Sequence, residues 1–213
     1  MEAIVVKILV VLVAYLLGSI PTAVWIGKGF YGIDVREHGS KNAGATNTIR
    51  TIGLLPGLVV FVIDVLKGFL AVKLLYFTDL YIPQTGSFIN FQLILGLAAL
   101  LGHIFPVFAQ FNGGKGVAVI AGVVFALHPW AMMAVFGIWI ICLIITKYVS
   151  LSSMIAGFCF PLMLIFVFPE TNSSIIIFAF CLAVLLIFTH QKNIERLVRG
   201  QEGKLRIKKN KTA

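Results

Sequence analysis

The sequence predicts an all-α integral membrane protein, a polytopic bundle of about seven transmembrane helices with the N-terminus outside and the C-terminus cytoplasmic. The 213-residue chain is 60% hydrophobic and only 12% charged, whereas a soluble domain carries about 25% charged residues. It contains several apolar runs of about 20 residues, the length that a helix needs to cross a bilayer. Its basic residues gather in loops and in a tail that can all face one side of the membrane.

The first two apolar runs predict spans at about residues 3–26 and 52–77. Pro21 predicts a kink near the inner end of the first span. The second span carries Asp64 and Lys67, which share one helical face because they are three residues apart. Ionisable groups inside a span are functional candidates, but we favour a structural ion pair here.

A third span is expected at about residues 93–111, bent at Pro106. The next apolar run, 117–145, is too long for one untilted span, and His128-Pro129 divides it. A single span would place the following Lys147–Ser150 turn and the basic tail on opposite sides of the membrane. Two short spans place all the basic segments on one side, as the positive-inside rule favours.

The last two spans are expected to end near Phe168 and to cover about Ser174–Phe188. We interpret 1–213 as one polytopic domain with a basic cytoplasmic tail, 191–213. Eight of the 17 Lys and Arg residues follow His190, which indicates contact with anionic membrane lipids and gives little support for nucleic acid. The three cysteines lie inside apolar runs and are interpreted as packing residues.

The stretch Asn112-Gly113-Gly114-Lys115-Gly116 is the first candidate site. Glycines let backbone N–H groups approach a ligand, Lys115 adds a positive charge, and the helix expected next points its N-terminus at the same place. This combination suits a phosphate. It is not a Walker A loop, because Ala109 and Gly116 stand where that pattern needs Gly and Ser or Thr. The alternative is a flexible turn whose lysine anchors at the lipid headgroups.

A polar segment, 28–50, is the second candidate. Its last part offers hydroxyl, amide and cationic groups on Ser40, Lys41, Asn42, Thr46, Asn47 and Arg50. These groups fit an oxyanion or a polyol ligand. The alternative is an ordinary solvated loop, which also favours Gly, Ser and Asn.

Two further segments reach the same predicted membrane face. Ser150 can cap the following helix or donate to a ligand. His190 and Asn193 share a face if the chain is helical there. The four segments gather cations and neutral donors, with only Glu37 and Glu195 as nearby carboxylates, so we expect an anion site without a metal. A phosphorylated metabolite from the cytoplasm can meet an acyl donor from the bilayer there.

These segments resemble the bacterial membrane acyl-phosphate:glycerol-3-phosphate acyltransferases, the PlsY family. Six stretches carry the resemblance, in family order: YLLGSIPT (15–22), GSKNAGATN (39–47), DVLKG (64–68), GHIFPVFAQFNGGKGV (102–117), YVSLS (148–152) and HQKNIERLVRG (190–200). Asn112 departs from the family, in which Lys is common at this position.

The resemblance implies transfer of an acyl group from acyl phosphate to the 1-hydroxyl of glycerol 3-phosphate, giving lysophosphatidic acid and orthophosphate. We expect a monomeric multi-pass enzyme of the bacterial inner membrane that needs no cofactor. The implied catalytic residues are Ser40, Lys115 and His190. The implied substrate-binding residues are Asn42, Thr46, Arg50, Gly113, Gly114, Gly116, Ser150 and Asn193. Residues 112–116 are called the glycine loop below. Arg50, Lys115 and the backbone amides of this loop are assigned to binding the phosphate charge.

Acyl phosphate is already activated, so catalysis can consist mainly of positioning and electrostatic stabilisation. Our hypothesis is that a substrate phosphate oxygen takes the hydroxyl proton, and the rival is His190 as general base. The alternative function is a membrane transporter of a phosphorylated small molecule. The sequence shows no inverted repeat, and its polar motifs gather on one face only, which argues against transport.

Overall fold

The computed structural model describes residues 2–205, and every regular element in this range is helical. In chain order these are α1 (Glu2–Ser19), α2 (Thr22–Tyr31), α3 (Ala45–Thr51), α4 (Leu54–Lys73), η1 (Leu74–Phe77), α5 (Gly86–Ile104), η2 (Val107–Ala109), α6 (Val117–Leu127), α7 (Pro129–Thr146), α8 (Val149–Phe166), α9 (Ser173–Thr189) and α10 (Gln191–Val198). The distal part of the predicted basic tail, 206–213, lies outside the described residues.

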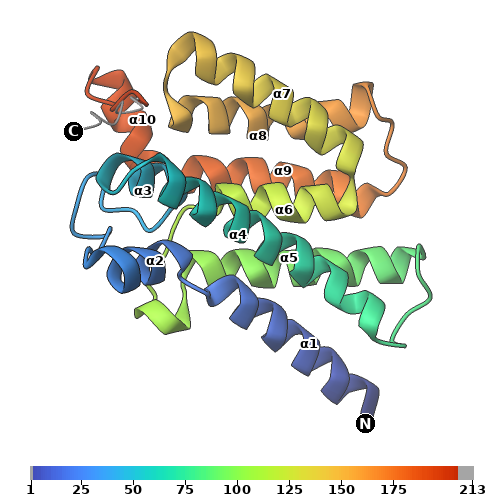
Figure 1. Cartoon of the computed structure of the whole chain (residues 1–213). Coiled ribbons are helices and arrows are strands. Elements are labelled where there is room, and N and C mark those ends of the chain that lie inside the picture. Colours follow the sequence, from blue (N-terminus) through green and yellow to red (C-terminus); the bar gives the residue numbers. More distant parts are fainter. Residues whose placement is uncertain (1, 206–213) are drawn as a thin grey trace.

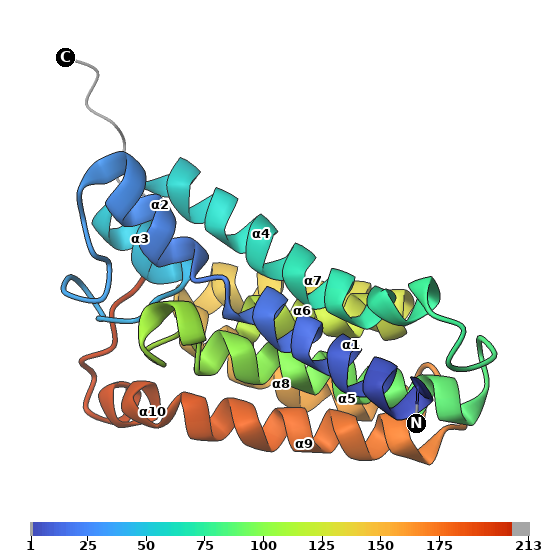
Figure 2. The same cartoon turned by 90° about the horizontal axis from the view of Figure 1, so that it is seen from below.

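The long helices run back and forth between two ends of a bundle. Short α2, α3 and α10 gather at one end, and the N-terminus lies at the other end (Figures 1 and 2). By length and composition, α1, α7, α8 and α5 extended through η2 can cross a membrane, and α9 joins them if it is taken with α10 as one bent span. The all-helical prediction is confirmed.

The first apolar run is two helices rather than one kinked helix. α1 ends at Ser19 and α2 begins at Thr22, so Pro21 breaks the helix, since proline lacks an N–H and disfavours helical backbone in the residue before it. Lys67 Nζ donates to the carbonyl oxygen of Ile20 over 2.9 Å. The break is therefore held by α4, a partner that a local sequence pattern does not reveal.

The predicted ion pair of α4 is present. Lys67 Nζ lies 2.8 Å from Asp64 Oδ1, and the two side chains are 4% and 3% exposed. The Thr22 hydroxyl donates to the same carboxylate oxygen over 2.9 Å. The pair thus connects α4 to the start of α2.

Two other helix ends differ from the prediction. α5 begins at Gly86, well before the expected start at residue 93, because Thr85 caps it by accepting a hydrogen bond from the Phe88 N–H over 3.3 Å. It ends at Ile104, so Pro106 follows the helix instead of bending it.

The break at His128 agrees with the prediction. α6 ends at Leu127 and α7 begins at Pro129, a favoured residue for the first helical position. His128 Nδ1 accepts a hydrogen bond from the Ala131 N–H over 3.2 Å, which caps α7.

Glycines let two pairs of helices touch along their main chains. In the α1–α5 pair, a Cβ atom on Gly18 would overlap the carbonyl oxygen of Ala99, and one on Gly102 would overlap that of Tyr15. The α4–α6 pair has the same reciprocal arrangement, with Gly68 against Val119 and Gly122 against Val65. Such close approach favours helix association in lipid, where apolar side chains gain little from leaving the solvent.

Candidate active site

A polar cavity of about 280 Å³ lies between the α3 region, the start of α6, the start of α8 and the end of α9. Nine of the predicted site residues line it: Ser40, Asn42, Thr46, Arg50, Lys115, Gly116, Ser150, His190 and Asn193. The structure thus brings together side chains from all four segments that the sequence singled out. Their chemical roles remain predictions.

Gly113 and Gly114 do not line this cavity but pack against α5. A Cβ atom on Gly113 would overlap the His103 carbonyl oxygen, and one on Gly114 would overlap His103 Nε2. The sequence predicts that the Gly114 N–H binds a phosphate. In the structure this N–H donates instead to the His103 carbonyl oxygen over 3.1 Å. Lys41 is exposed and lines a separate open pocket, together with Gly113.

The end of the glycine loop does face the cavity. Gly116 has a φ of +84°, a left-handed conformation that favours glycine, and α6 begins at the next residue. Val117 and Ala118, in the first turn of α6, line the cavity. The first N–H groups of a helix have no acceptor within it, so the positive end of α6 is directed at this space, as predicted.

Asn47 organises the loop that carries Ser40 and Asn42. Its amide nitrogen donates to the carbonyl oxygens of Val35 (2.6 Å) and Asn42 (3.0 Å), and its amide oxygen accepts from the Ser40 N–H (2.8 Å). Asn47 is one of the donors that the sequence predicts for a ligand. Because its polar atoms bond to the backbone, it holds the loop in shape instead.

Lys115 and Asn193 meet across the cavity. The Lys115 ammonium donates to Asn193 Oδ1. Burial, and secondarily the positive charge of Arg196, lowers the pKa of Lys115 to about 8. Burial also lowers the pKa of the Arg50 guanidinium, which nevertheless stays charged. Two cations therefore lie in one partly buried space.

His190 lies at the junction of α9 and α10, which meet at an angle of 61°. Its Nδ1 is 2.8 Å from the Leu186 carbonyl oxygen, which can only accept, so Nδ1 carries the proton. Nε2 is then left with a lone pair. Burial and the nearby Lys115 charge lower the pKa of His190 to about 4, so the imidazole is neutral at pH 7.

Glu202 is a cavity residue that the sequence analysis missed. It is 7% exposed and accepts from Ser150 Oγ (2.8 Å), Asn193 Nδ2 (2.7 Å) and Arg196 Nε (2.8 Å). Ser150 therefore donates to this carboxylate, and its side chain does not cap α8. The available signal was one acidic residue between Gly200 and Gly203 in the tail that we interpret as a basic cytoplasmic segment in contact with anionic lipids.

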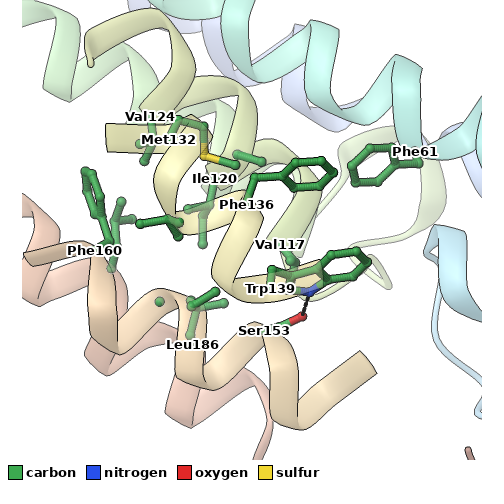
Figure 3. A pocket seen from close by; sticks show the side chains of 15 residues that line it. Phe61, Val117, Ile120, Val124, Met132, Phe136, Trp139, Ser153, Phe160 and Leu186 are labelled. Atoms are coloured by element: carbon green, nitrogen blue, oxygen red, sulfur yellow. Dashed lines mark hydrogen bonds between the residues drawn. The ribbon is translucent and has the colours of Figure 1, made fainter. Parts of the chain in front are cut away.

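An apolar pocket of about 80 Å³ adjoins the polar cavity (Figure 3). The two spaces share wall residues, namely Phe61, Val117, Phe136, Trp139 and Ser153. The Trp139 indole N–H donates to Ser153 Oγ over 3.2 Å, which satisfies the polar edge of the ring at this boundary. A charged headgroup and an apolar chain can therefore bind side by side.

Known proteins are similar to this chain in sequence and in fold. A family model described as glycerol-3-phosphate acyltransferase matches residues 8–200. The glycerol-3-phosphate acyltransferase of Listeria welshimeri is 43% identical over 93% of this chain and 96% of its own length, and that of Fusobacterium nucleatum is 41% identical over 92% and 97%.

Two solved structures have the same fold. The crystal structure of PlsY (YgiH), an integral membrane glycerol 3-phosphate acyltransferase, superposes in its glycerol 3-phosphate form with a TM-score of 0.82, at 36% identity over 94% of this chain and 96% of that one. The lysophosphatidic acid form gives a TM-score of 0.80 at 35% identity, with the same coverage. These comparisons do not favour the transporter alternative. The chain is an integral membrane acyltransferase that belongs to the glycerol-3-phosphate acyltransferase family.

Proposed function

We propose that this chain transfers a fatty acyl group from acyl phosphate to the 1-hydroxyl of glycerol 3-phosphate, releasing lysophosphatidic acid and orthophosphate. The observation that carries the proposal is the junction of the polar cavity with the apolar pocket, which share Phe136 and Trp139. Acyl phosphate has the same division, a charged phosphate next to an apolar chain. The solved relative named for its glycerol 3-phosphate and lysophosphatidic acid forms supports the acceptor and the product.

The charges of the cavity suggest how the substrates are held. Arg50, Lys115 and the N-terminus of α6 attract phosphate charge. Ser40, Asn42 and Thr46 supply neutral hydrogen bonds to phosphate oxygens. Gly116 allows close approach, whereas Gly113 and Gly114 support the loop from behind. Ser150, His190 and Asn193 face the glycerol 3-phosphate side.

The acyl transfer needs one proton acceptor. The 1-hydroxyl oxygen attacks the acyl carbonyl carbon, the bond from that carbon to the phosphate oxygen breaks, and the hydroxyl proton leaves with the phosphate. A phosphate with a second pKa of about 6 is a stronger base than His190, whose pKa is about 4. We therefore assign the proton to a substrate phosphate oxygen, and we assign His190 to orienting the hydroxyl through Nε2.

Replacing His190 with Gln tests this assignment. We expect the KM for glycerol 3-phosphate to rise about 10-fold, the cost of roughly one hydrogen bond, with kcat largely retained. Steady-state kinetics with both substrates varied measure the two constants. A kcat reduced by two orders of magnitude at an unchanged KM would instead identify His190 as the general base.

The topology that we propose has seven crossings, α1 and α4 to α9, with the N-terminus outside and the C-terminus in the cytoplasm of a bacterial inner membrane. α6 has 11 residues, which extend only about 16 Å at 1.5 Å per residue, compared with about 30 Å of hydrocarbon. Its N-terminus, and the cavity beside it, would then lie below the cytoplasmic surface of the bilayer. Such a depth suits a donor that arrives from the lipid phase.

We propose that the enzyme acts as a monomer. The direct test of function gives the purified protein glycerol 3-phosphate with acyl phosphate, acyl-CoA or acyl carrier protein as donor. We expect equal amounts of orthophosphate and lysophosphatidic acid from acyl phosphate alone. Transfer from a thioester donor would reject the proposed donor, and uptake into sealed vesicles without transfer would indicate transport.

A further inference from the structure

Hydrogen bonds connect the C-terminal segment to the glycine-loop lysine. Glu202 Oε1 accepts from Asn193 Nδ2 over 2.7 Å, and Asn193 Oδ1 accepts from the Lys115 ammonium. The carboxylate therefore fixes which way the Asn193 amide points, because only its nitrogen can donate to Glu202. Its oxygen is then directed at Lys115.

The segment that carries Glu202 is held at several points. Gly200 has a φ of +66°, which turns the chain after α10. The Gly203 carbonyl oxygen accepts from Arg50 Nη2 over 2.7 Å, and the Leu205 N–H donates to the Lys147 carbonyl oxygen over 2.8 Å. Glu202 is therefore a built part of the cavity wall and not the end of a solvated tail.

Charges from several elements surround Lys115. The titratable and charged residues that line the cavity or act on Lys115 are Arg50 on α3, Asp64 on α4, His103 on α5, His190 after α9, Arg196 on α10, and Glu202. Within residues 2–205, the carboxylates that line the cavity are Asp64 and Glu202, and Asp64 is paired with Lys67 at 2.8 Å. Glu202 is thus the carboxylate that can balance the positive charges around Lys115.

We propose that Glu202 is a positioning residue for the acyl transfer, which holds the Lys115 ammonium in the cavity through Asn193 and supplies the negative charge that keeps it protonated. This inference rests on the proposed role of Lys115 in binding phosphate. Burial, Arg196 and Arg50 lower the pKa of Lys115, and Glu202 raises it. The hydrogen bonds orient the Lys115 ammonium, and the carboxylate charge favours its protonated form.

The test is the pH profile of a Glu202→Gln variant. Glutamine can still accept from Asn193, so mainly the charge is lost. Lys115 acts in its protonated form, so activity declines as the pH rises through the pKa of Lys115, which is about 8 in the native chain. In the Glu202→Gln variant, we expect the alkaline decline of kcat/KM (the alkaline limb) to occur about one pH unit lower than in the native chain. The activity of this variant should recover toward pH 6.

Two variants serve as controls. Glu195→Gln removes a carboxylate from the same region, but Glu195 and its partner Arg199 are 57% and 64% exposed, so the alkaline limb should stay in place. Arg196→Gln removes a positive charge that lowers the pKa of Lys115, so it should move the limb to higher pH. This opposite shift keeps the inference testable if Glu202→Gln does not fold.

The outcomes separate this inference from the proposed site. If Lys115→Met is inactive while Glu202→Gln lowers activity equally at every pH, Glu202 is merely structural and the inference is overturned. If Lys115→Met is fully active, the role of Lys115 is wrong and the inference fails with it. Opposite shifts in the Glu202 and Arg196 variants, with no shift in the Glu195 variant, support it.

Discussion

Replacing Lys115 with Met should reduce kcat/KM by about 100- to 1000-fold, the usual effect of removing one preorganised charged donor from an active site. Lys115 is a partly buried cation at the polar cavity, directly before the N-terminus of α6. Among residues 2–205, Arg50 is the other Lys or Arg residue that lines the cavity, and its own proposed phosphate contact leaves the charge of Lys115 without a substitute. Release of orthophosphate and lysophosphatidic acid, followed together, measures the loss.

The matched control is Lys192→Met. Lys192 is an exposed lysine of α10 close to the cavity residues in sequence, so we expect this variant to keep nearly full activity. If the two variants lost activity equally, general membrane-surface charge rather than a specific phosphate contact would be responsible. Melting temperatures in detergent show whether either variant is misfolded.

Replacing Asp64 with Ala should destabilise the fold by about 3–5 kcal/mol, the cost of leaving one member of a buried ion pair without its partner. The Lys67 side chain, which is 4% exposed in the native structure, would lose its carboxylate partner, and the Thr22 hydroxyl would lose the carboxylate oxygen to which it donates. Thermal unfolding in detergent should show a clearly lower midpoint. The same change should disturb the α1–α2 break that Lys67 supports.

The double variant Asp64→Leu/Lys67→Met separates charge from packing. Replacing a buried pair by apolar residues of similar volume is often neutral or stabilising, so we expect the double variant to regain most of the midpoint lost by the single one. A double variant as unstable as Asp64→Ala would show that the hydrogen bonds to Thr22 and Ile20 matter more than the charges. Activity is measured alongside, because Asp64 also lines the cavity.

Long apolar runs and prolines predicted most helices, but not all their ends. Whether a proline kinks or ends a helix depends on partners distant in sequence. At Pro21 the helix ends, and Lys67 of α4 holds the break by donating to the Ile20 carbonyl oxygen. The early start of α5 was open to prediction from its Thr85 cap, a local signal. Hydropathy alone predicts that this helix begins at residue 93, because residues 86–92 are a mixture of polar and apolar residues.

The site residues that could be predicted from the sequence are those that lie in dense polar motifs. Ser40, Arg50, Lys115 and His190 belong to such motifs and line one cavity. Glu202 lies outside these motifs, in a basic tail, and it contacts Ser150, Asn193 and Arg196 because the chain turns back after Gly200. A contact made by a returning tail has no periodicity, so the pattern that reveals helices does not reveal it.

The four glycines at the α1–α5 and α4–α6 crossings have a genetic consequence. Each faces a main-chain carbonyl oxygen of the neighbouring helix, and every amino acid carries that same oxygen. No side-chain exchange on the neighbouring helix can therefore make room for an added methyl group. Gly157 is different, because a Cβ atom there would meet the side chain of Leu186, which a smaller residue would clear. A screen for second-site suppressors should thus rescue alanine at position 157 and yield only true revertants at the four crossing glycines.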